Sequence, residues 1–148
     1  MKKTLDEFDA AMKKTARMLS KRMHSSAEIR QKLRRAACSD EIITKVVAEL
    51  CKLAYLDDAR FASGYAAELS KKGIGRNLIL KKMMLRGIPR ELCEVNLPFD
   101  KDIEKEKALS FLDSKKRVLL REQNKLKLKG KIFRMLSAKG FRSDIISE

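Results

Sequence analysis

The sequence predicts an all-α protein of three tandem three-helix repeats, which form an elongated, curved helical array of right-handed type. Apolar residues recur at three- and four-residue steps along the chain, and no useful β-alternation interrupts them. Capping residues and glycines punctuate this pattern at the spacing of short helices. A third observation is a motif that recurs at offsets of 50 and 53 residues. Stacked units of this kind present a long surface rather than a pocket, which favours binding over catalysis.

The recurring motif contains apolar positions, a small residue that ends a helix and an apolar start to the next helix. Its three copies are Ile29, Leu33, Ala37, Cys38, Ser39, Glu41 and Ile42; Ile79, Met83, Gly87, Ile88, Pro89, Glu91 and Leu92; and Ile132, Leu136, Gly140, Phe141 and Ile145. Each copy joins two helices of one unit. The chain is therefore expected to divide into units of residues 1–56, 57–99 and 100–148.

The first unit is expected to begin with a helix that runs to about Arg22. Its inward face consists of Phe8, Ala11, Met12, Thr15, Ala16, Leu19 and Met23. Ser25 and Glu28 have the spacing of a capping box, so a second helix starts there, with Ile29, Leu33 and Ala36 inward. Ser39, Asp40 and Glu41 cap a third helix. The apolar face of that helix is Ile42, Ile43, Val46, Val47, Leu50 and Leu53.

The second unit opens with Asp57 or Asp58 as the N-cap of a helix that ends at the sequence 71–73 (KKG). Its inward face is Phe61, Ala62, Tyr65, Ala66 and Leu69. Residues 76–85 form the second helix, with Leu78, Ile79, Lys82 and Met83 on it, and Gly87 ends that helix. Pro89 suits the first turn of a third helix over about residues 90–96, because that turn tolerates a missing N–H.

The third unit starts near Asp102. The inward face of its first helix is expected to be Ile103, Ala108, Leu109, Phe111 and Leu112. Residues 115–131 form the densest basic run, opposed only by Glu122. A second helix covers residues 131–138, Gly140 ends it, and Phe141, Ile145 and Ile146 begin a short final helix. About nine helices are expected in all.

Composition limits the classes of function. The chain of 148 residues carries 35 Lys and Arg against 20 Asp and Glu, a formal charge of +15, so it is expected to bind a polyanion or an acidic protein surface. The three cysteines are odd in number and form no CxxC motif, so buried, reduced thiols are expected. No export signal or membrane-spanning segment is recognisable, which predicts a cytoplasmic protein without membrane contact.

No residue pattern indicates an active site, a metal or another cofactor. Asp57 and Asp58 are better explained by helix capping than by acid–base catalysis. His24 is the only histidine, so it is expected to have a structural role between two helices. The sequence 71–75 (KKGIG) lacks the P-loop pattern and is interpreted as a basic helix turn that can contact a partner or DNA. Phe61 and Tyr65 share a face with Leu69, which favours core packing over base stacking.

Several segments together resemble the RecX family of bacterial regulatory proteins. They are 21–33 (KRMHSSAEIRQKL), 54–62 (AYLDDARFA), 71–75 (KKGIG) and 136–141 (LSAKGF) with Ile145. The resemblance implies a non-enzymatic modulator of the RecA recombinase that lies in the groove of the RecA–DNA filament. It also implies inhibition of RecA's ATPase, strand-exchange and coprotease activities, and hence an effect on DNA repair, recombination and the SOS response.

The expected partner is thus the RecA filament on DNA, with DNA phosphates as secondary contacts, no small-molecule substrate, and the chain acting as a monomer. The candidate contact residues are Arg17, Lys21, Arg22, Lys71, Lys72, Arg76, Lys115, Lys116, Arg117, Arg121, Lys125 and Lys127. Two alternatives stay open. One is a stand-alone basic helical DNA-binding protein, with helices such as residues 76–86 in the major groove. The other is a helical scaffold for an acidic protein.

Overall fold

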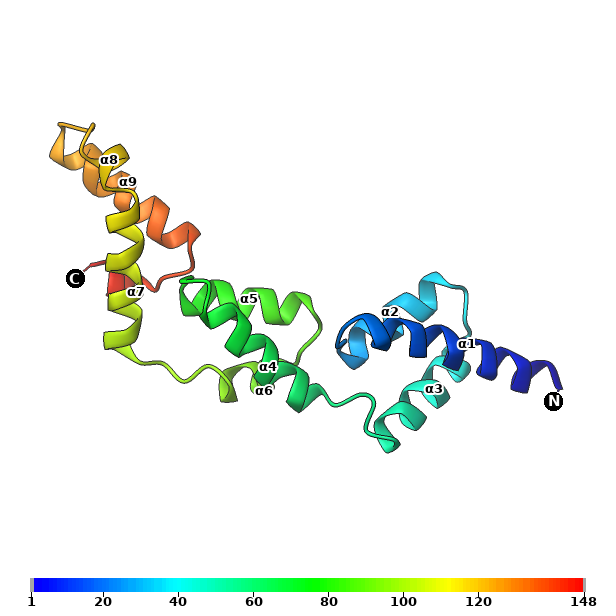
Figure 1. Ribbon diagram of the computed structural model, residues 1–148. Coiled ribbons are helices and arrows are strands. Elements are labelled where there is room, and N and C mark those ends of the chain that lie inside the picture. The colour runs from blue at the N-terminus through cyan, green and yellow to red at the C-terminus, as the bar shows by residue number, and fades with distance from the viewer. Residues whose placement is uncertain (1, 148) are drawn as a thin grey trace.

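The computed structural model describes residues 2–147, and these residues contain helices and no strand (Figure 1). The first group of helices is α1 (Lys2–Lys21), α2 (Ser26–Arg35) and α3 (Asp40–Lys52). The second is α4 (Asp58–Ser70), α5 (Arg76–Leu85) and α6 (Arg90–Val95). The third is α7 (Lys101–Ser114), α8 (Lys116–Leu119), α9 (Lys125–Ala138) and α10 (Ser143–Ile146). The all-α prediction is confirmed.

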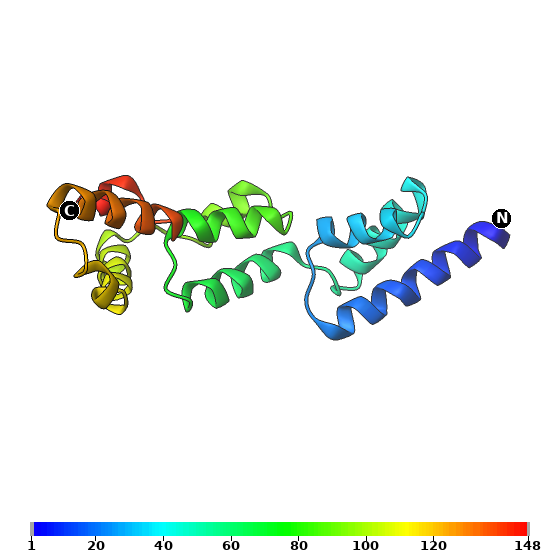
Figure 2. The same cartoon turned by 90° about the horizontal axis from the view of Figure 1, so that it is seen from above.

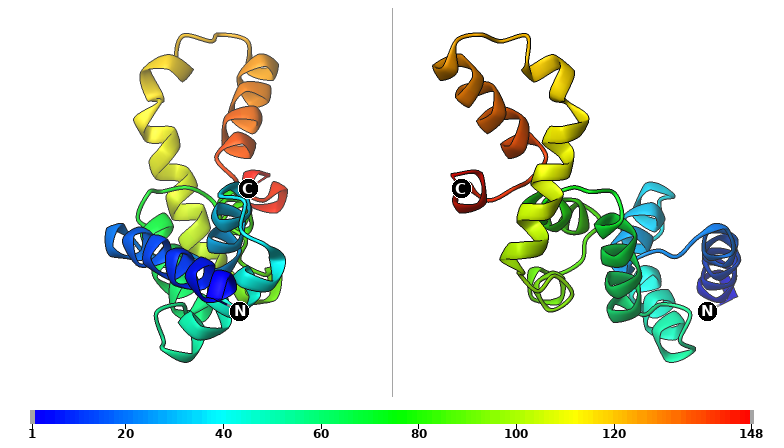
Figure 3. Two further views of the ribbon diagram at one scale, coloured as in Figure 1. Left: turned by 90° about the vertical axis from the view of Figure 1, so that its right-hand side faces the viewer. Right: turned by 60° about the vertical axis from the view of Figure 1, so that its left-hand side comes forward.

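The three groups follow one another along an elongated, curved molecule, with the two termini at opposite ends (Figure 1). Each group has its own hydrophobic cluster, centred on Leu33 and Val46, on Met83 and Cys93, and on Leu136 and Phe141. The third cluster is the smallest, and Figure 3 shows α7 and α9 projecting from the rest of the array, joined at their far ends through α8. The elongated repeat prediction is confirmed, whereas its right-handed sense stays a prediction.

Most helix starts are capped as the sequence predicts. The Ser25 hydroxyl accepts from the N–H of Glu28 at 3.1 Å, and the Glu28 carboxylate accepts from the N–H of Ser25, which completes the capping box. Ser39 caps α3. Of the two aspartates, Asp57 is the N-cap of α4. α5 has the predicted limits, and Pro89 lies one position before α6, as its N-cap, rather than within its first turn.

The third unit departs most from the prediction. α9 begins at Lys125, six residues before the predicted start, because the Asn124 side chain accepts from the N–H groups of Leu126 and Lys127. The short α8 was not predicted, so the described residues hold ten helices rather than about nine. Much of the basic run is therefore helical.

Several predicted inward residues are exposed instead. Leu53 is 49% exposed because it is the C-cap of α3, beyond the last buried turn. In α7, Ile103 is 50% and Leu109 58% exposed, whereas Glu104 is only 5% exposed. The inward face of α7 is therefore rotated to include Glu104. The other predicted inward or buried residues that are exposed are Ala16, Met23 and Cys51; Cys38 and Ala36 are half-buried.

The second helices of the three units follow one another along the array, in the order α9, α5 and α2 (Figure 2). The N–H of Gly75, before α5, donates to the Lys139 carbonyl at the end of α9 at 2.8 Å, and the N–H of Asn77 donates to the Gly140 carbonyl at 2.9 Å. Similarly, the Ser25 hydroxyl, before α2, donates to the Arg86 carbonyl at the end of α5. The N-terminus of one helix thus meets the C-terminus of the next, which aligns their dipoles favourably.

Glycines make this close approach possible. Gly87 and Gly140 have φ values of 81° and 89°, and a Cβ at either position would lie 2.3 Å from a side-chain atom of Ala27 or Leu78 in the neighbouring unit. The equivalent residue of the first unit is Ala37, with a φ of 63°. All three units therefore have the same backbone turn with positive φ. Only the turns at Gly87 and Gly140 leave space for a helix of the neighbouring unit.

Candidate binding surface

The third-unit candidates lie together on the hairpin formed by α7, α8 and α9. All six are exposed, from the C-cap of α7 through α8 and into the first turn of α9: Lys115, Lys116, Arg117, Arg121, Lys125 and Lys127. No ion pair to any of them occurs among residues 2–147. Among the candidate contact residues, these six form the largest group of cations without an ion pair in the described part of the chain.

The first-unit candidates divide into two kinds. Arg17 and Lys21 are exposed on α1. Arg22 instead donates to the Glu28 carboxylate at 2.7 Å and to the Met23 carbonyl at 2.9 Å, so much of its hydrogen-bonding capacity is used within the molecule. Its contribution to a partner surface is correspondingly smaller than that of Arg17 and Lys21.

The second-unit candidates divide in the same way. Lys71 and Lys72 are exposed at the end of α4. Arg76 is half-buried, and its Nε donates to the Leu97 carbonyl at 2.9 Å while its backbone N–H donates to Glu104 at 3.0 Å. Arg76 therefore joins the second unit to the third through its backbone N–H, and its role as a contact residue stays a prediction.

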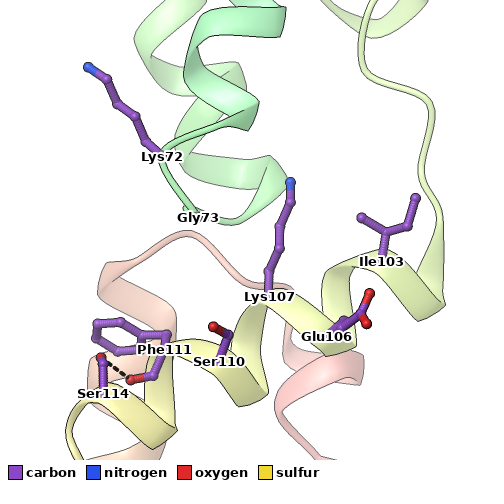
Figure 4. A pocket seen from close by; sticks show the side chains of 8 residues that line it. All are labelled: Lys72, Gly73, Ile103, Glu106, Lys107, Ser110, Phe111 and Ser114. Atoms are coloured by element: carbon purple, nitrogen blue, oxygen red, sulfur yellow. Dashed lines mark hydrogen bonds between the residues drawn. The ribbon is translucent and has the colours of Figure 1, made fainter.

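A groove of about 420 Å³ lies between the α4–α5 turn and α7. Figure 4 shows the side chains of Lys107 and Phe111 rising from α7, and Lys72 on the turn, directed away from Phe111. The groove carries both signs of charge, since Glu106 also lines it. The N–H groups of Gly75, Arg76 and Asn77 all donate to acceptors in the third unit, so these three N–H groups at the start of α5 are not available to a phosphate.

A larger basic surface, which we call the basic column, was not predicted from the sequence. It consists of α2, α5 and α9, whose residues include twelve Lys and Arg and one acidic residue, Glu28. The members that were not predicted are Arg30, Lys32, Arg34, Arg35, Lys81, Lys82, Lys129, Lys131 and Arg134. Counting charge separately in the second helix of each repeat would have found them, because those helices stack in the fold.

Glu28 is half-buried at the junction of the first and second units and forms ion pairs with two arginines there. Its Oε2 lies 2.7 Å from Arg22 Nη2 and 3.2 Å from Arg86 Nη1. Burial alone raises the pKa of the Glu28 carboxyl, but the hydrogen bonds from Arg22 and Ser25 and the charge of Arg86 outweigh it, so the pKa is lowered. The Arg86 guanidinium also lies 5.4 Å from the centre of the Tyr65 ring. Glu28 therefore stabilises the junction between the first and second units.

His24 has the predicted structural role between α1 and α2. It is buried, its Nδ1 lies 3.0 Å from the Arg22 carbonyl oxygen, and its Nε2 lies 3.1 Å from Lys32 Nζ. The carbonyl can only accept and the ammonium can only donate, so Nδ1 carries the hydrogen and Nε2 is the acceptor. Burial lowers the pKa of His24, in keeping with a neutral ring.

Residues 2–147 contain no group of three or more His, Cys, Asp or Glu side chains placed to hold a metal ion. None of the described helices combines the length and the apolar character needed to cross a membrane. The three cysteines are free thiols, and only Cys93 is fully buried.

Comparison with known proteins agrees with this architecture. The family model "RecX, first three-helix domain" matches residues 11–50. The regulatory protein RecX of Clostridium botulinum strain Alaska E43 is 29% identical, over 99% of this chain and 71% of that protein. RecX of Bacillus licheniformis is 31% identical, over 96% of this chain and 54% of that protein. The crystal structure of RecX from Lactobacillus salivarius superposes with a TM-score of 0.85 at 21% identity, covering 97% of this chain and 94% of that one.

The chain belongs to the RecX family. The RecX resemblance in the sequence is thereby confirmed, and the all-helical architecture is that of the solved RecX structures. The RecX family model ends within α3, so it covers most of the first group of helices. This chain spans about half the length of the Bacillus RecX protein.

Proposed function

We propose that this RecX-family chain is a non-catalytic regulator that binds the RecA nucleoprotein filament and inhibits its ATPase, strand-exchange and coprotease activities. Through these activities it would affect DNA repair, recombination and the SOS response. The proposal includes action as a cytoplasmic monomer without a cofactor, and units with the limits 1–56, 57–99 and 100–148. The separate hydrophobic clusters support the division into units.

The observation that carries the proposal is the basic column on an elongated array. Apart from Arg76, which is held at the junction, the three helices carry eleven cations against one acid, and these would attract a polyanionic surface along much of the molecule. A nucleoprotein filament offers such a surface, because its DNA runs past successive RecA protomers. A ligand that contacts several protomers stabilises one subunit spacing, and a filament that must change its spacing during ATP turnover is then inhibited.

The test measures ATP hydrolysis by RecA on saturating single-stranded DNA as this protein is added. Inhibition well below one molecule per RecA protomer is expected, since each bound molecule restrains several protomers. Strand exchange measured in parallel should fall over the same concentrations. Full RecA activity at equimolar protein, with the chain shown to be folded, would contradict the proposal.

A stand-alone DNA-binding protein is the second candidate, and the same basic column favours it. Such a protein would bind naked DNA as tightly as the filament, and would affect RecA only once the DNA itself is coated. Binding to bare single-stranded DNA and to preassembled filaments, compared at the same salt concentration, separates the two candidates. A helical scaffold for an acidic protein would bind neither.

A further inference from the structure

The units are joined at the turn that follows a second helix. The first unit has the equivalent turn after α2, but no other unit within residues 2–147 is joined to it there. At each of the two junctions, the C-terminal turn of one second helix receives the N-terminus of another. The Arg86 carbonyl accepts from Ser25, and the carbonyls of Lys139 and Gly140 accept from the start of α5. The equivalent residues of the first unit are Ala36 and Ala37, and no hydrogen bond from residues 2–147 reaches their carbonyl oxygens.

An acidic residue from the first helix of the receiving unit completes each junction. Asp58 of α4 accepts from the N–H of Ser26 at 2.8 Å, and Glu104 of α7 accepts from the N–H of Arg76 at 3.0 Å. Both N–H groups belong to the first residue of the incoming helix. The corresponding helix of the first unit, α1, places Glu7 beside the vacant turn, in a pocket of about 370 Å³ that includes Ala36 and Ala37.

We infer that this pocket, which we call the Ala37 socket, binds the N-terminal turn of a helix from a protein partner. The first turn of the partner helix donates to the carbonyls of Ala36 and Ala37 and to the Glu7 carboxylate. Within the chain, the carbonyls accept from the Ser25 hydroxyl before α2 and from the N–H groups of Gly75 and Asn77 at the start of α5. This inference rests on the proposed function, and the partner is therefore a RecA protomer of the filament. The socket would hold the protein component while the basic column faces the DNA.

The chemistry of the socket excludes two other occupants. Two carbonyl oxygens and a carboxylate repel phosphate, and Lys14 is the only cation among the lining residues, so DNA does not fit there. A second copy of the chain does not fit either. The remaining second-helix N-terminus is that of α9, where the Asn124 side chain already accepts from Leu126 and Lys127 and where Leu126 is 81% exposed.

The socket also specifies the incoming helix. Gly87 and Gly140 leave room for a side chain of the neighbouring helix, whereas the Ala37 methyl group fills that room. The partner helix must therefore carry a glycine in its first turn, at the place of Ala27 in α2. This requirement selects against the chain's own helices and for a partner with that sequence.

Two pairs of matched variants of the full chain test the socket, measured as affinity for preassembled RecA filaments. Glu7→Gln removes the acidic acceptor and should weaken binding about tenfold, the effect typical of a hydrogen bond to a charged group. Asp6→Asn makes the same charge change on an exposed neighbour and should stay within about twofold. Ala10→Gln fills the pocket and should weaken binding at least as much as Glu7→Gln, whereas Ala16→Gln, exposed and outside the pocket, should not.

Thermal unfolding of the four variants establishes that each is folded. Wild-type affinity of Glu7→Gln and Ala10→Gln, with inhibition of RecA intact, would overturn the socket and leave the proposed function standing. Equal losses of binding to bare single-stranded DNA would overturn it as well, because the pocket would then contact nucleic acid. If the wild-type chain neither binds nor inhibits filaments, both the proposed function and the socket are wrong.

Discussion

The carboxylate of Glu104 accepts a hydrogen bond from the backbone N–H of Arg76, with 3.0 Å between Oε2 and N. The N-cap of α5 is Gly75, which has no side chain to cap the helix, so an acid 28 residues away performs this task. Asp58 likewise accepts from the first N–H of α2, in addition to the cap that Ser25 provides. A carboxylate at a helix N-terminus satisfies an unpaired donor and meets the positive end of the helix dipole. The units are therefore joined by polar contacts as well as by apolar packing.

Replacing Glu104 by alanine should weaken the junction between the second and third units. The loss of a charge-assisted cap is expected to lower the free energy of unfolding by about 1–2 kcal/mol. Urea denaturation followed by circular dichroism measures this loss. Glu106→Ala, in an exposed position two residues later, should change stability by less than about 0.5 kcal/mol. Equal effects of the two substitutions would show that the contact with Arg76 stabilises nothing.

Two glycine substitutions separate backbone strain from the close approach of the units. Gly73 and Gly140 both have positive φ, at 70° and 89°. A Cβ on Gly73 would meet nothing within 4 Å, so Gly73→Ala should cost only the strain, about 1 kcal/mol. A Cβ on Gly140 would lie 2.3 Å from Leu78, so Gly140→Ala should cost clearly more and increase the radius of gyration. Thermal unfolding and solution scattering measure the two effects; a similar cost at both positions would contradict the tight junction.

Local signals were sufficient to predict most helix starts and the repeat. The pair Ser25 and Glu28 forms its capping box within four residues, and the limits of α5 follow from Gly75 and Gly87 on either side. The failures lie where distant residues decide. Ile103 and Leu109 have the right spacing for a core face, yet α7 turns Glu104 inward because the N-terminus of α5 needs an acceptor.

The candidate surface was predicted less well for the same reason. Arg76 is one of several similar basic residues in the sequence, and only the contacts with Leu97 and Glu104 distinguish it as a junction residue. The basic column depends on the stacking of α2, α5 and α9, which lie about 50 residues apart in the chain. A charge count along the sequence finds the run at residues 115–131 but cannot add together helices that meet only in the fold.

Acidification should destabilise the packing of α1 against α2 in the first unit through His24. Its pKa is lowered by burial from the ordinary value of 6.5, so the unfolded chain takes up the proton first as the pH falls. The contribution of His24 to stability is therefore complete above pH 6.5 and decreases below it, by at most about 1.4 kcal/mol per pH unit. Protonation also removes the acceptor for Lys32 and adds a positive charge beside Arg22 and Lys32, with Glu28 as the nearby acid.

Urea denaturation between pH 7.5 and 5.5 measures this dependence. His24→Gln should be less stable at pH 7.5 and should lose most of the slope below pH 6.5. Glu28 acts in a lower range, because its lowered pKa keeps it charged until the pH falls below its ordinary value of 4.5. A slope unchanged in His24→Gln would assign the titration to another group.

The basic column should be detectable in the salt dependence of binding. Neutralising one phosphate of single-stranded DNA contributes about −0.7 to the slope of log K against log salt concentration. Lys125, Lys127 and Lys129 are exposed on α9, so changing all three to glutamine should make the slope shallower by about 2 if each contacts a phosphate. The matched control changes Lys3, Lys13 and Lys52 to glutamine, which removes the same charge from exposed positions on α1 and α3. Because counterions are released only where a cation meets a phosphate, the control should keep the wild-type slope. Equal changes in both triple variants would mean that net charge, rather than the column, attracts the DNA.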